Sequence, residues 1–189
     1  MLQMALKEWA VICDVLLAGE QALLVRKGGI AETGGPGRFQ LEVPRFALFP
    51  AWLHQMPKRI KPKWRDCVRV FDHEPAEILI QGCGVAEHVW RVPTREALDA
   101  LGNLHVWTPD QLDMRWNYKP HQPLFLLAVR VFRLAAPQTI ANSPHYAGCK
   151  SWVDLDAADV VDDRGATAVL DDANFEAIVS RIDAELLHV

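Results

Sequence analysis

Arg26 and Lys27 close a run of apolar residues and are followed directly by Gly28 and Gly29. Glycine lets the backbone turn its N–H groups toward a ligand, and two cations beside such a turn suit an anion such as a phosphate or carboxylate. The four residues are therefore candidate ligand-binding residues. An ordinary strand end would have the same composition, so both interpretations stay open.

Two histidine–glutamine pairs form a second group of chemically capable residues. His54 and Gln55 follow an apolar stretch, and His121 with Gln122 precedes another. Histidine can act as a general base near neutral pH, and a neighbouring glutamine can orient water. His54 and Gln55 are thus candidate catalytic residues, and His121 is a candidate ligand-binding residue. A hydrogen-bonded structural histidine is the alternative at both positions.

A third group lies in the stretch GCKSW at residues 148–152. Lys150, Ser151 and Trp152 could present a cation, a hydroxyl and an aromatic ring to a nucleotide, or they could form a packed turn. Ser151 lacks the G-x-S-x-G context of a serine nucleophile, and Cys149 has no identified base. Nucleophilic catalysis is therefore not indicated.

Charge is distributed unevenly along the chain, whose net charge is −4. Between residues 57 and 69, one anion, Asp66, faces six cations: Lys58, Arg59, Lys61, Lys63, Arg65 and Arg69. This basic segment could contact a nucleic-acid backbone, with Trp64 and the earlier Trp52 as stacking groups. A solvated charged face is the alternative. Seven aspartates lie between residues 154 and 172, opposed by Arg164 alone.

Composition excludes several classes of protein. The 189 residues include four cysteines without a C-x-x-C pair, so neither a disulfide framework nor a zinc ribbon is indicated. The spacing of His145 and Cys149 would suit metal ligands on one helical turn, but Pro144 and Gly148 indicate a loop there, so we expect no metal and no cofactor. No apolar run approaches the roughly 20 residues of a membrane span. We therefore expect a cytoplasmic protein that neither enters a membrane nor is exported, and the oligomeric state stays open.

Periodicity predicts the elements that position these residues. Apolar residues spaced at three and four predict a helix over residues 2–19, and apolar runs predict strands over 21–26, 45–49 and 124–134. Residues 78–92 indicate two strands or one bulged strand, because Gly82 and Gly84 interrupt them. Thr94 can cap a helix that ends near Gly102, and TPDQ at 108–111 is typical of a capping box. A final helix spans the apolar positions from 175 to 186.

The irregular order of these elements favours an α+β fold. We expect a small mixed, barrel-like sheet with N-terminal, inserted and C-terminal helices. Residues 1–155 would form a single domain, and residues 156–189 would form an acidic connection and a C-terminal helix packed on it. If the strands ending at Arg26 and before His54 are parallel neighbours, then Arg26, Lys27, His54 and Gln55 emerge at one edge and line one concavity.

Four blocks of sequence carry a resemblance to a known family: LKEWAV, ALLVRKGGI, LFPAWLHQ and GCKSWVDL. Together, over residues 6–155, they resemble the uncharacterised bacterial domain-of-unknown-function family 1802 (DUF1802). In that family the LFP block usually continues with threonine and an acidic residue before His-Gln, whereas Ala51 and Leu53 stand here. The family has no established activity, so the resemblance implies no mechanism. The stretches from 126 to 140 and from 146 to 152 are also loosely similar to the closing strands of PUA-like barrels, which bind RNA or modified bases.

These observations favour a module that recognises an anionic ligand, either nucleic acid or a nucleotide. A hydrolase that acts on a phosphate-containing substrate through His54 and Gln55 is the first alternative. A protein-interaction module, in which tryptophans fill a partner's groove, is the second.

Overall fold

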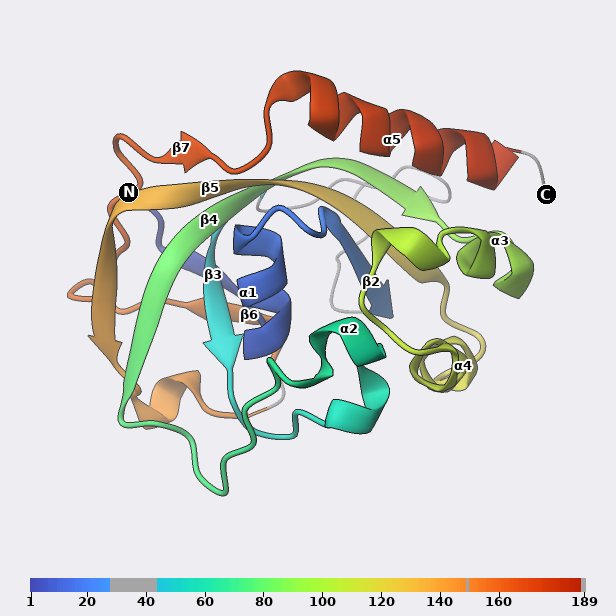
Figure 1. The fold of residues 1–189 in the computed structure, drawn as a ribbon. Helices are drawn as coiled ribbons and strands as arrows, with labels where there is room; N and C mark the ends of the chain where they lie inside the picture. The colour runs from blue at the N-terminus through green and yellow to red at the C-terminus, as the bar shows by residue number, and fades with distance from the viewer. Residues whose placement is uncertain (28–43, 149, 188–189) are drawn as a thin grey trace.

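The computed structural model describes residues 1–27, 44–148 and 150–187, which form an α+β fold (Figure 1). Its strands are β1 (Met4–Trp9), β2 (Leu23–Lys27), β3 (Arg45–Ala51), β4 (Glu77–Arg91), β5 (Leu124–Ala141), β6 (Trp152–Asp154) and β7 (Thr167–Ala168). Its helices are α1 (Ala10–Leu17), α2 (Pro62–Arg65), α3 (Arg95–Ala100), α4 (Pro109–Asn117) and α5 (Asp172–Leu187). The predicted α+β class, with N-terminal, inserted and C-terminal helices, is confirmed.

The described strands form one mixed sheet in the order β2-β5-β4-β3-β1-β6, and β7 pairs with β5. The pairing of β1 with β3 is parallel, whereas the other pairings of the described strands are antiparallel. The predicted strands over 21–26, 45–49 and 124–134 therefore share one sheet, as expected. Residues 78–92 form the single bulged strand β4, because its register with β5 shifts between Ile80 and Gly82 and between Ala86 and His88.

The sheet curls into a half-barrel around α1. Figure 1 shows β4 and β5 arching over this helix. A β-bulge bends its strand, and a glycine at the bend allows another part of the chain to approach the strand closely. A Cβ atom at Gly82 would lie 2.5 Å from Cδ2 of Leu17 and 2.8 Å from the carbonyl oxygen of Phe132. The missing side chain at Gly82 thus lets the curled sheet contact α1.

Curling also brings distant strands of the sheet together. In the sheet order, β5, β4 and β3 separate β2 from β1. Nonetheless, Nη2 of Arg26 on β2 donates a hydrogen bond to the carbonyl oxygen of Lys7 on β1, at 3.1 Å. Side chains from both strands can therefore line one cavity.

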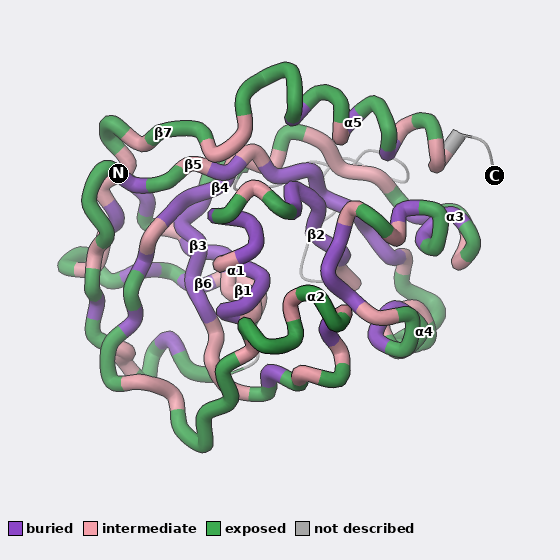
Figure 2. Tube along the Cα trace, in the orientation of Figure 1, coloured by how far each residue is buried: buried purple, intermediate pink, exposed green. Residues whose placement is uncertain are grey.

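The core surrounds α1, every residue of which is buried except Asp14. Figure 2 shows this helix as a buried element inside the sheet, whereas α5 lies outside it and is largely exposed. On its inner side, α5 buries Phe175, Val179 and Ile182. Segment 156–187 packs on the rest of the chain through this helix, and the division of the chain at residue 155 stays a prediction.

The predicted helix over residues 2–19 is wrong in its first half, where β1 forms instead. Ala5 and Leu6 are adjacent in the chain and both buried, because β1 lies inside the sheet between β3 and β6. A helix there would leave β3 without its parallel partner. Apolar spacing alone did not reveal this pairing, which depends on strands far away in the chain.

The inserted helices follow the predicted pattern with one correction. The hydroxyl of Thr94 accepts a hydrogen bond from the N–H of Ala97 at 3.2 Å, which caps α3 as expected. Helix α4 begins at Pro109, but Thr108 makes no side-chain cap; its hydroxyl donates to the carbonyl oxygen of Arg59 at 3.3 Å. Within the described parts of the chain, no helix combines the length and the apolar composition that a membrane span requires.

Candidate anion-binding site

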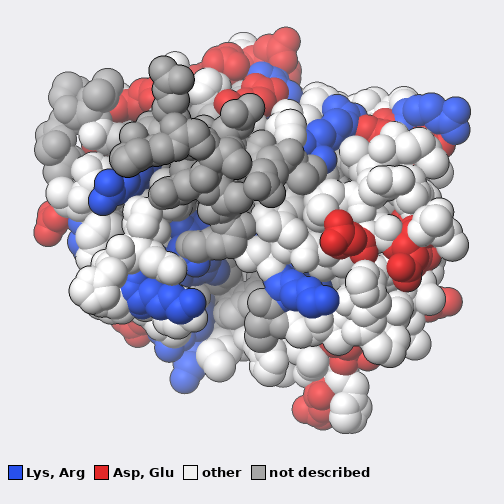
Figure 3. All heavy atoms as spheres, turned by 180° about the vertical axis from the view of Figure 1, so that it is seen from behind, with Lys and Arg blue, Asp and Glu red and all other residues white. Residues whose placement is uncertain are grey.

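A cavity of about 550 Å³, which we call the main cavity, lies where β1, β2 and the end of β3 meet the segment after β5. Four of the candidate site residues line it: Arg26, His54, Lys150 and Ser151. Lys7, Glu8, Trp9, Phe49, Glu74, Asn142 and Ser143 are also among its lining residues. Figure 3 shows that this side of the molecule is hollowed near its centre, with Lys and Arg side chains on both sides of the hollow.

Arg26 is a firmly positioned cation in the wall of the main cavity. It follows the buried residues Leu23, Leu24 and Val25 of β2, and 12% of its own side chain is exposed. Its Nη2 lies 3.1 Å from the carbonyl oxygen of Lys7 and 3.7 Å from Oε2 of Glu8. A guanidinium has five N–H donors, so these contacts leave donors for a ligand.

Lys7 and Lys150 bring further positive charge to the cavity. Nζ of Lys7 donates to the carbonyl oxygens of Tyr146 and Gly148, and it lies 5.1 Å from the ring centroid of Phe49. Lys150 is exposed, and its Nζ donates to the carbonyl oxygen of His145 at 3.1 Å. Lys7 therefore fixes the wall of the cavity, whereas Lys150 lies at its accessible side.

His54 lies at the end of β3 in the left-handed backbone region, with φ of 65°. Such a conformation is uncommon for residues other than glycine and occurs often at functional sites. The histidine is exposed and lines the main cavity together with Glu74. Its side chain is therefore accessible to a ligand bound beside Arg26.

Gln55 points into the protein instead of the cavity, which contradicts its predicted role in orienting water. It is 5% exposed, and its Oε1 accepts a hydrogen bond from the N–H of Val11 at 2.9 Å. Its Nε2 donates to the carbonyl oxygen of Arg69, also at 2.9 Å. Trp9 is the N-cap residue of α1, but its side chain makes no capping hydrogen bond. Gln55, which is distant in the sequence, instead accepts a hydrogen bond from a free N–H of the first turn. Its role is structural.

Arg26 and His54 line one cavity, but the predicted reason is wrong. Strands β2 and β3 are not parallel neighbours, because β5 and β4 lie between them. The curl of the sheet, with Arg26 reaching Lys7 on β1, brings the two side chains together. Gly28, Gly29 and Cys149 lie outside the described residues.

A second cavity of about 490 Å³, which we call the side cavity, adjoins the main cavity beside α4. The two cavities share Trp9, Arg26 and Ser151. The other lining residues of the side cavity are Lys27, Gln111, Met114, Arg115 and Tyr118. Lys27 therefore lies next to the predicted site in a separate compartment.

Backbone carbonyl groups hold the cations of the side cavity. Nζ of Lys27 donates to the carbonyl oxygen of Trp116 at 2.6 Å, and Nη1 of Arg115 donates to that of Val25 at 2.5 Å. Burial lowers the pKa of Lys27. It also lowers the pKa of Arg115, an effect that Glu8 opposes and Arg26 reinforces. Both charges are thus held in surroundings poorer in water than the surface.

The basic segment does not line the main or the side cavity, and its ligand-binding role stays a prediction. Nζ of Lys61 donates to the carbonyl oxygens of Gly102 and His105, and Nη1 of Arg59 donates to that of Asp110. Lys63 pairs with Glu20 at 2.7 Å, and Nε1 of Trp64 donates to the same carboxylate at 2.6 Å. Lys58 is exposed and lines neither cavity. Most of the segment's cations and its tryptophan therefore bind this chain's own groups.

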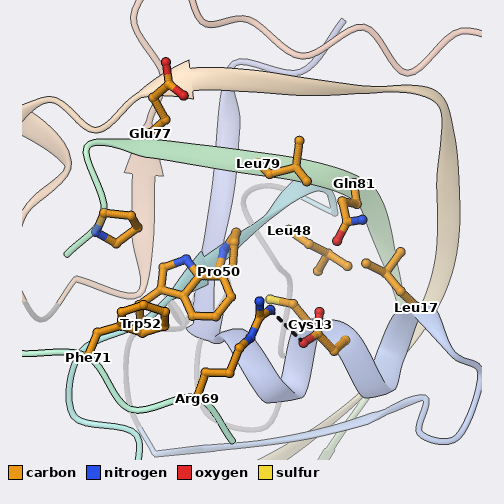
Figure 4. Close-up of a pocket in the computed structure, with 12 residues that line it drawn as sticks. Cys13, Leu17, Leu48, Pro50, Trp52, Arg69, Phe71, Glu77, Leu79 and Gln81 are labelled. Atoms are coloured by element: carbon orange, nitrogen blue, oxygen red, sulfur yellow. Dashed lines mark ion pairs between the residues drawn. The ribbon is translucent and has the colours of Figure 1, made fainter. Parts of the chain in front are cut away.

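Trp52 lines a third cavity, of about 270 Å³, between β3, β4 and α1 (Figure 4). Its ring packs against Phe71 with centroids 5.4 Å apart, and the guanidinium of Arg69 lies 4.3 Å from its centroid. Arg69 also lies 3.7 Å from a carboxylate oxygen of Asp14, the ion pair drawn in Figure 4. Trp52 therefore lines a different cavity, although its N–H donates to Oε2 of Glu74, a lining residue of the main cavity, at 3.4 Å.

The two remaining candidates also lie outside the site. Trp152 packs edge-on against Phe46, with ring centroids 5.3 Å apart, and so contributes to the core. His121 is exposed in the connection before β5 and lines none of the three cavities. In the described parts of the chain, no group of three or more His, Cys, Asp or Glu side chains could hold a metal ion.

Several lining residues were not predicted from the sequence, among them Lys7, Glu8, Trp9 and Arg115. Lys7, Glu8 and Trp9 lie on β1 and line the main cavity. The sequence predicted a helix in this segment, and so it did not indicate that these residues line a cavity. Arg115 lies in the last turn of α4, and a basic residue there is common at the C-terminal end of any helix. The contact of α4 with β2, through the hydrogen bond from Arg115 to Val25, places Arg115 in the wall of the side cavity.

Comparison with known proteins places the chain in a family. Residues 5–181 match the family described as domain of unknown function DUF1802, so the chain belongs to that family, as the four sequence blocks indicated. No curated protein matches the chain. A crystal structure of a mutant ZmASCH protein from Zymomonas mobilis is similar to it, with a TM-score of 0.46 and 10% sequence identity. That similarity covers 94% of this chain and 96% of the other.

Proposed function

We propose that the main cavity binds an anionic ligand, either a nucleotide or one nucleotide of a nucleic-acid strand. The position of Arg26 carries the proposal: its guanidinium is fixed by β1 in the wall of a cavity whose volume is typical of small-molecule sites. Lys150 adds an accessible cation. Asn142, Ser143 and Ser151 add hydrogen-bonding groups that could orient a sugar or a base.

Glu8 sets how Arg26 can act. The carboxylate is 6% exposed and lies 3.7 Å from Nη2 of Arg26, so it partly offsets the positive charge. It also orients the guanidinium, because an arginine held by a carboxylate loses less freedom when a ligand arrives. The pair therefore favours precise binding over strong nonspecific attraction.

A hydrolase that acts on a phosphate-containing substrate is the second candidate. It is supported by His54 and Glu74, which line the same cavity as Arg26. In such an enzyme His54 would act as the base without help from Gln55, whose amide is bonded to the backbone of Val11 and Arg69. Product formation that wild type shows and His54→Ala loses would favour this candidate over simple recognition.

The protein-interaction alternative has less support. None of the seven tryptophans is among the exposed large hydrophobic residues: Trp107 is buried and the other six are half-buried. Trp52, Trp64 and Trp152 each contact aromatic or charged groups of this chain.

The binding proposal is tested with a labelled single-stranded RNA of random sequence, by fluorescence anisotropy at several salt concentrations. The test variant combines Arg26→Gln with Glu8→Gln, which removes the buried ion pair without changing the net charge. We expect it to weaken binding about tenfold or more, as for loss of hydrogen bonds to a charged group. Arg164→Gln is the control, because Arg164 is exposed, pairs with Asp162 and lines neither cavity. Equal affinity of the double variant and wild type would refute the proposal.

A further inference from the structure

We propose that the side cavity is a phosphate subsite, so that the ligand spans both cavities with its phosphate beside α4 and its nucleoside in the main cavity. This inference rests on the proposed function. It assigns the phosphate to Arg26, Lys27 and Arg115, which all line the side cavity.

The charges of the two cavities differ. Among the described lining residues, the side cavity has three cations and no carboxylate. The main cavity also has three, Lys7, Arg26 and Lys150, but two carboxylates, Glu8 and Glu74, line it as well. An anion is therefore better stabilised in the side cavity, where no lining carboxylate repels it.

Two of the three cations of the side cavity have no carboxylate partner among the described residues. Lys27 and Arg115 form no ion pair there, whereas Arg26 is paired with Glu8. Burial disfavours their charged forms, as the lowered pKa of each indicates. Glu8 offsets part of the charge of Arg115, and a phosphate held between Arg115 and Lys27 would supply further negative charge.

The cations are held in place before any ligand binds. Lys27 of β2 donates to the carbonyl oxygen of Trp116 in α4, and Arg115 of α4 donates to the carbonyl oxygen of Val25 in β2. Each element therefore positions the cation of the other. Nε of Arg115 is buried without a hydrogen-bond partner, and so is Oε1 of Gln111, which is itself 4% exposed. Both residues line the side cavity, so unpaired polar atoms, which are rare in folded proteins, lie next to its cations.

The shared lining residues connect the phosphate to the rest of the ligand. Trp9, Arg26 and Ser151 border both compartments, so a ligand bound at Arg26 can extend from one to the other. Beyond them, the main cavity has the neutral hydrogen-bonding groups of Asn142 and Ser143 and the ring of Phe49. These groups suit a sugar and a base, which carry many hydrogen-bonding atoms and no charge of their own.

The experiment measures the binding of inorganic phosphate by ³¹P NMR line broadening and of the labelled random RNA by anisotropy. Two variants each remove one cation: Lys27→Gln from the side cavity and Lys150→Gln from the main cavity. Glutamine removes the charge at each position but keeps a hydrogen-bond donor, and thermal unfolding checks that both variants fold. We expect Lys27→Gln to weaken phosphate binding about tenfold and Lys150→Gln to change it less than twofold.

Equal weakening of phosphate binding by both variants, or a larger effect of Lys150→Gln, would overturn the phosphate subsite. So would phosphate binding that Lys27→Gln leaves unchanged, or its absence from a wild-type protein that binds RNA. In each of these cases RNA binding that depends on Arg26 would leave the proposed function standing. A wild-type protein that binds neither probe would overturn both proposals.

Discussion

Gln55→Ala tests whether Gln55 has the structural role that the fold gives it. The substitution removes two hydrogen bonds of 2.9 Å, a buried one from the N–H of Val11 and a part-buried one to the carbonyl oxygen of Arg69. Loss of an N-terminal helix cap costs about 1 kcal/mol, and loss of an ordinary hydrogen bond costs about 0.5–1.5 kcal/mol. We therefore expect a loss of about 2 kcal/mol in the free energy of unfolding, or roughly 4–8 °C in Tm for a chain of this size.

Chemical denaturation followed by circular dichroism measures the loss, and two further variants sharpen it. Gln55→Glu keeps an acceptor for Val11 but cannot donate to Arg69 when ionised, so at neutral pH it should also destabilise the protein. Gln122→Ala is the matched control, because Gln122 is exposed, and its effect should lie within about 0.5 kcal/mol of zero. A Gln55→Ala protein as stable as the Gln122→Ala control would refute the structural role.

Three further predictions concern the core and the basic segment. His105 is buried and its pKa is lowered to about 3, chiefly by burial, so only the unfolded chain binds its proton between about pH 6.5 and 3. Stability should therefore fall as the pH falls through that window, and His105→Gln should show a shallower fall in urea denaturation at successive pH values. Gly82→Ala should destabilise the protein by about 1–3 kcal/mol, because the added methyl group would meet Leu17 and the backbone of Phe132; an unchanged denaturation midpoint would contradict this. Replacing Lys58 and Lys63 together by glutamine should leave the salt slope of RNA binding unchanged, whereas the slope would fall by about 0.7 for each of the two lysines that binds a phosphate of the RNA.

The sequence predicted the elements whose signals are local. The apolar runs of β2, β3 and β5, the hydroxyl cap of Thr94 and the amphipathic α5 each depend on residues close together in the chain. Strand β1 was missed because its partners, β3 and β6, lie about 40 and 150 residues away, and pairing with them outweighs the helical spacing of its apolar residues. Local periodicity cannot contain that information.

The positions of the candidate site residues depend on contacts between distant parts of the chain. Arg26 and His54 do share a cavity, but the curl of a sheet that separates their strands brings them together, and no local pattern encodes that curl. Charge density did not reveal that Lys61 and Lys63 of the basic segment bind groups from other parts of this chain. Gln55 resembled a catalytic residue because it follows a histidine, whereas its backbone partners Val11 and Arg69 are visible only in the fold. The ligand-binding roles of Arg26, Lys27, Lys150 and Ser151 stay predictions.

Photo-crosslinking tests the proposed binding site most directly, because it reports where a nucleic-acid strand lies on the protein. Single-stranded RNA that contains 4-thiouridine would be irradiated with the wild-type protein, and the crosslinked peptides would be identified by mass spectrometry. We expect crosslinks to residues of the two adjoining cavities, such as Trp9, Phe49 and Tyr118, and their loss in the variant that combines Arg26→Gln with Glu8→Gln. Crosslinks confined to the basic segment at Trp64, and unaffected by that variant, would contradict the proposed site.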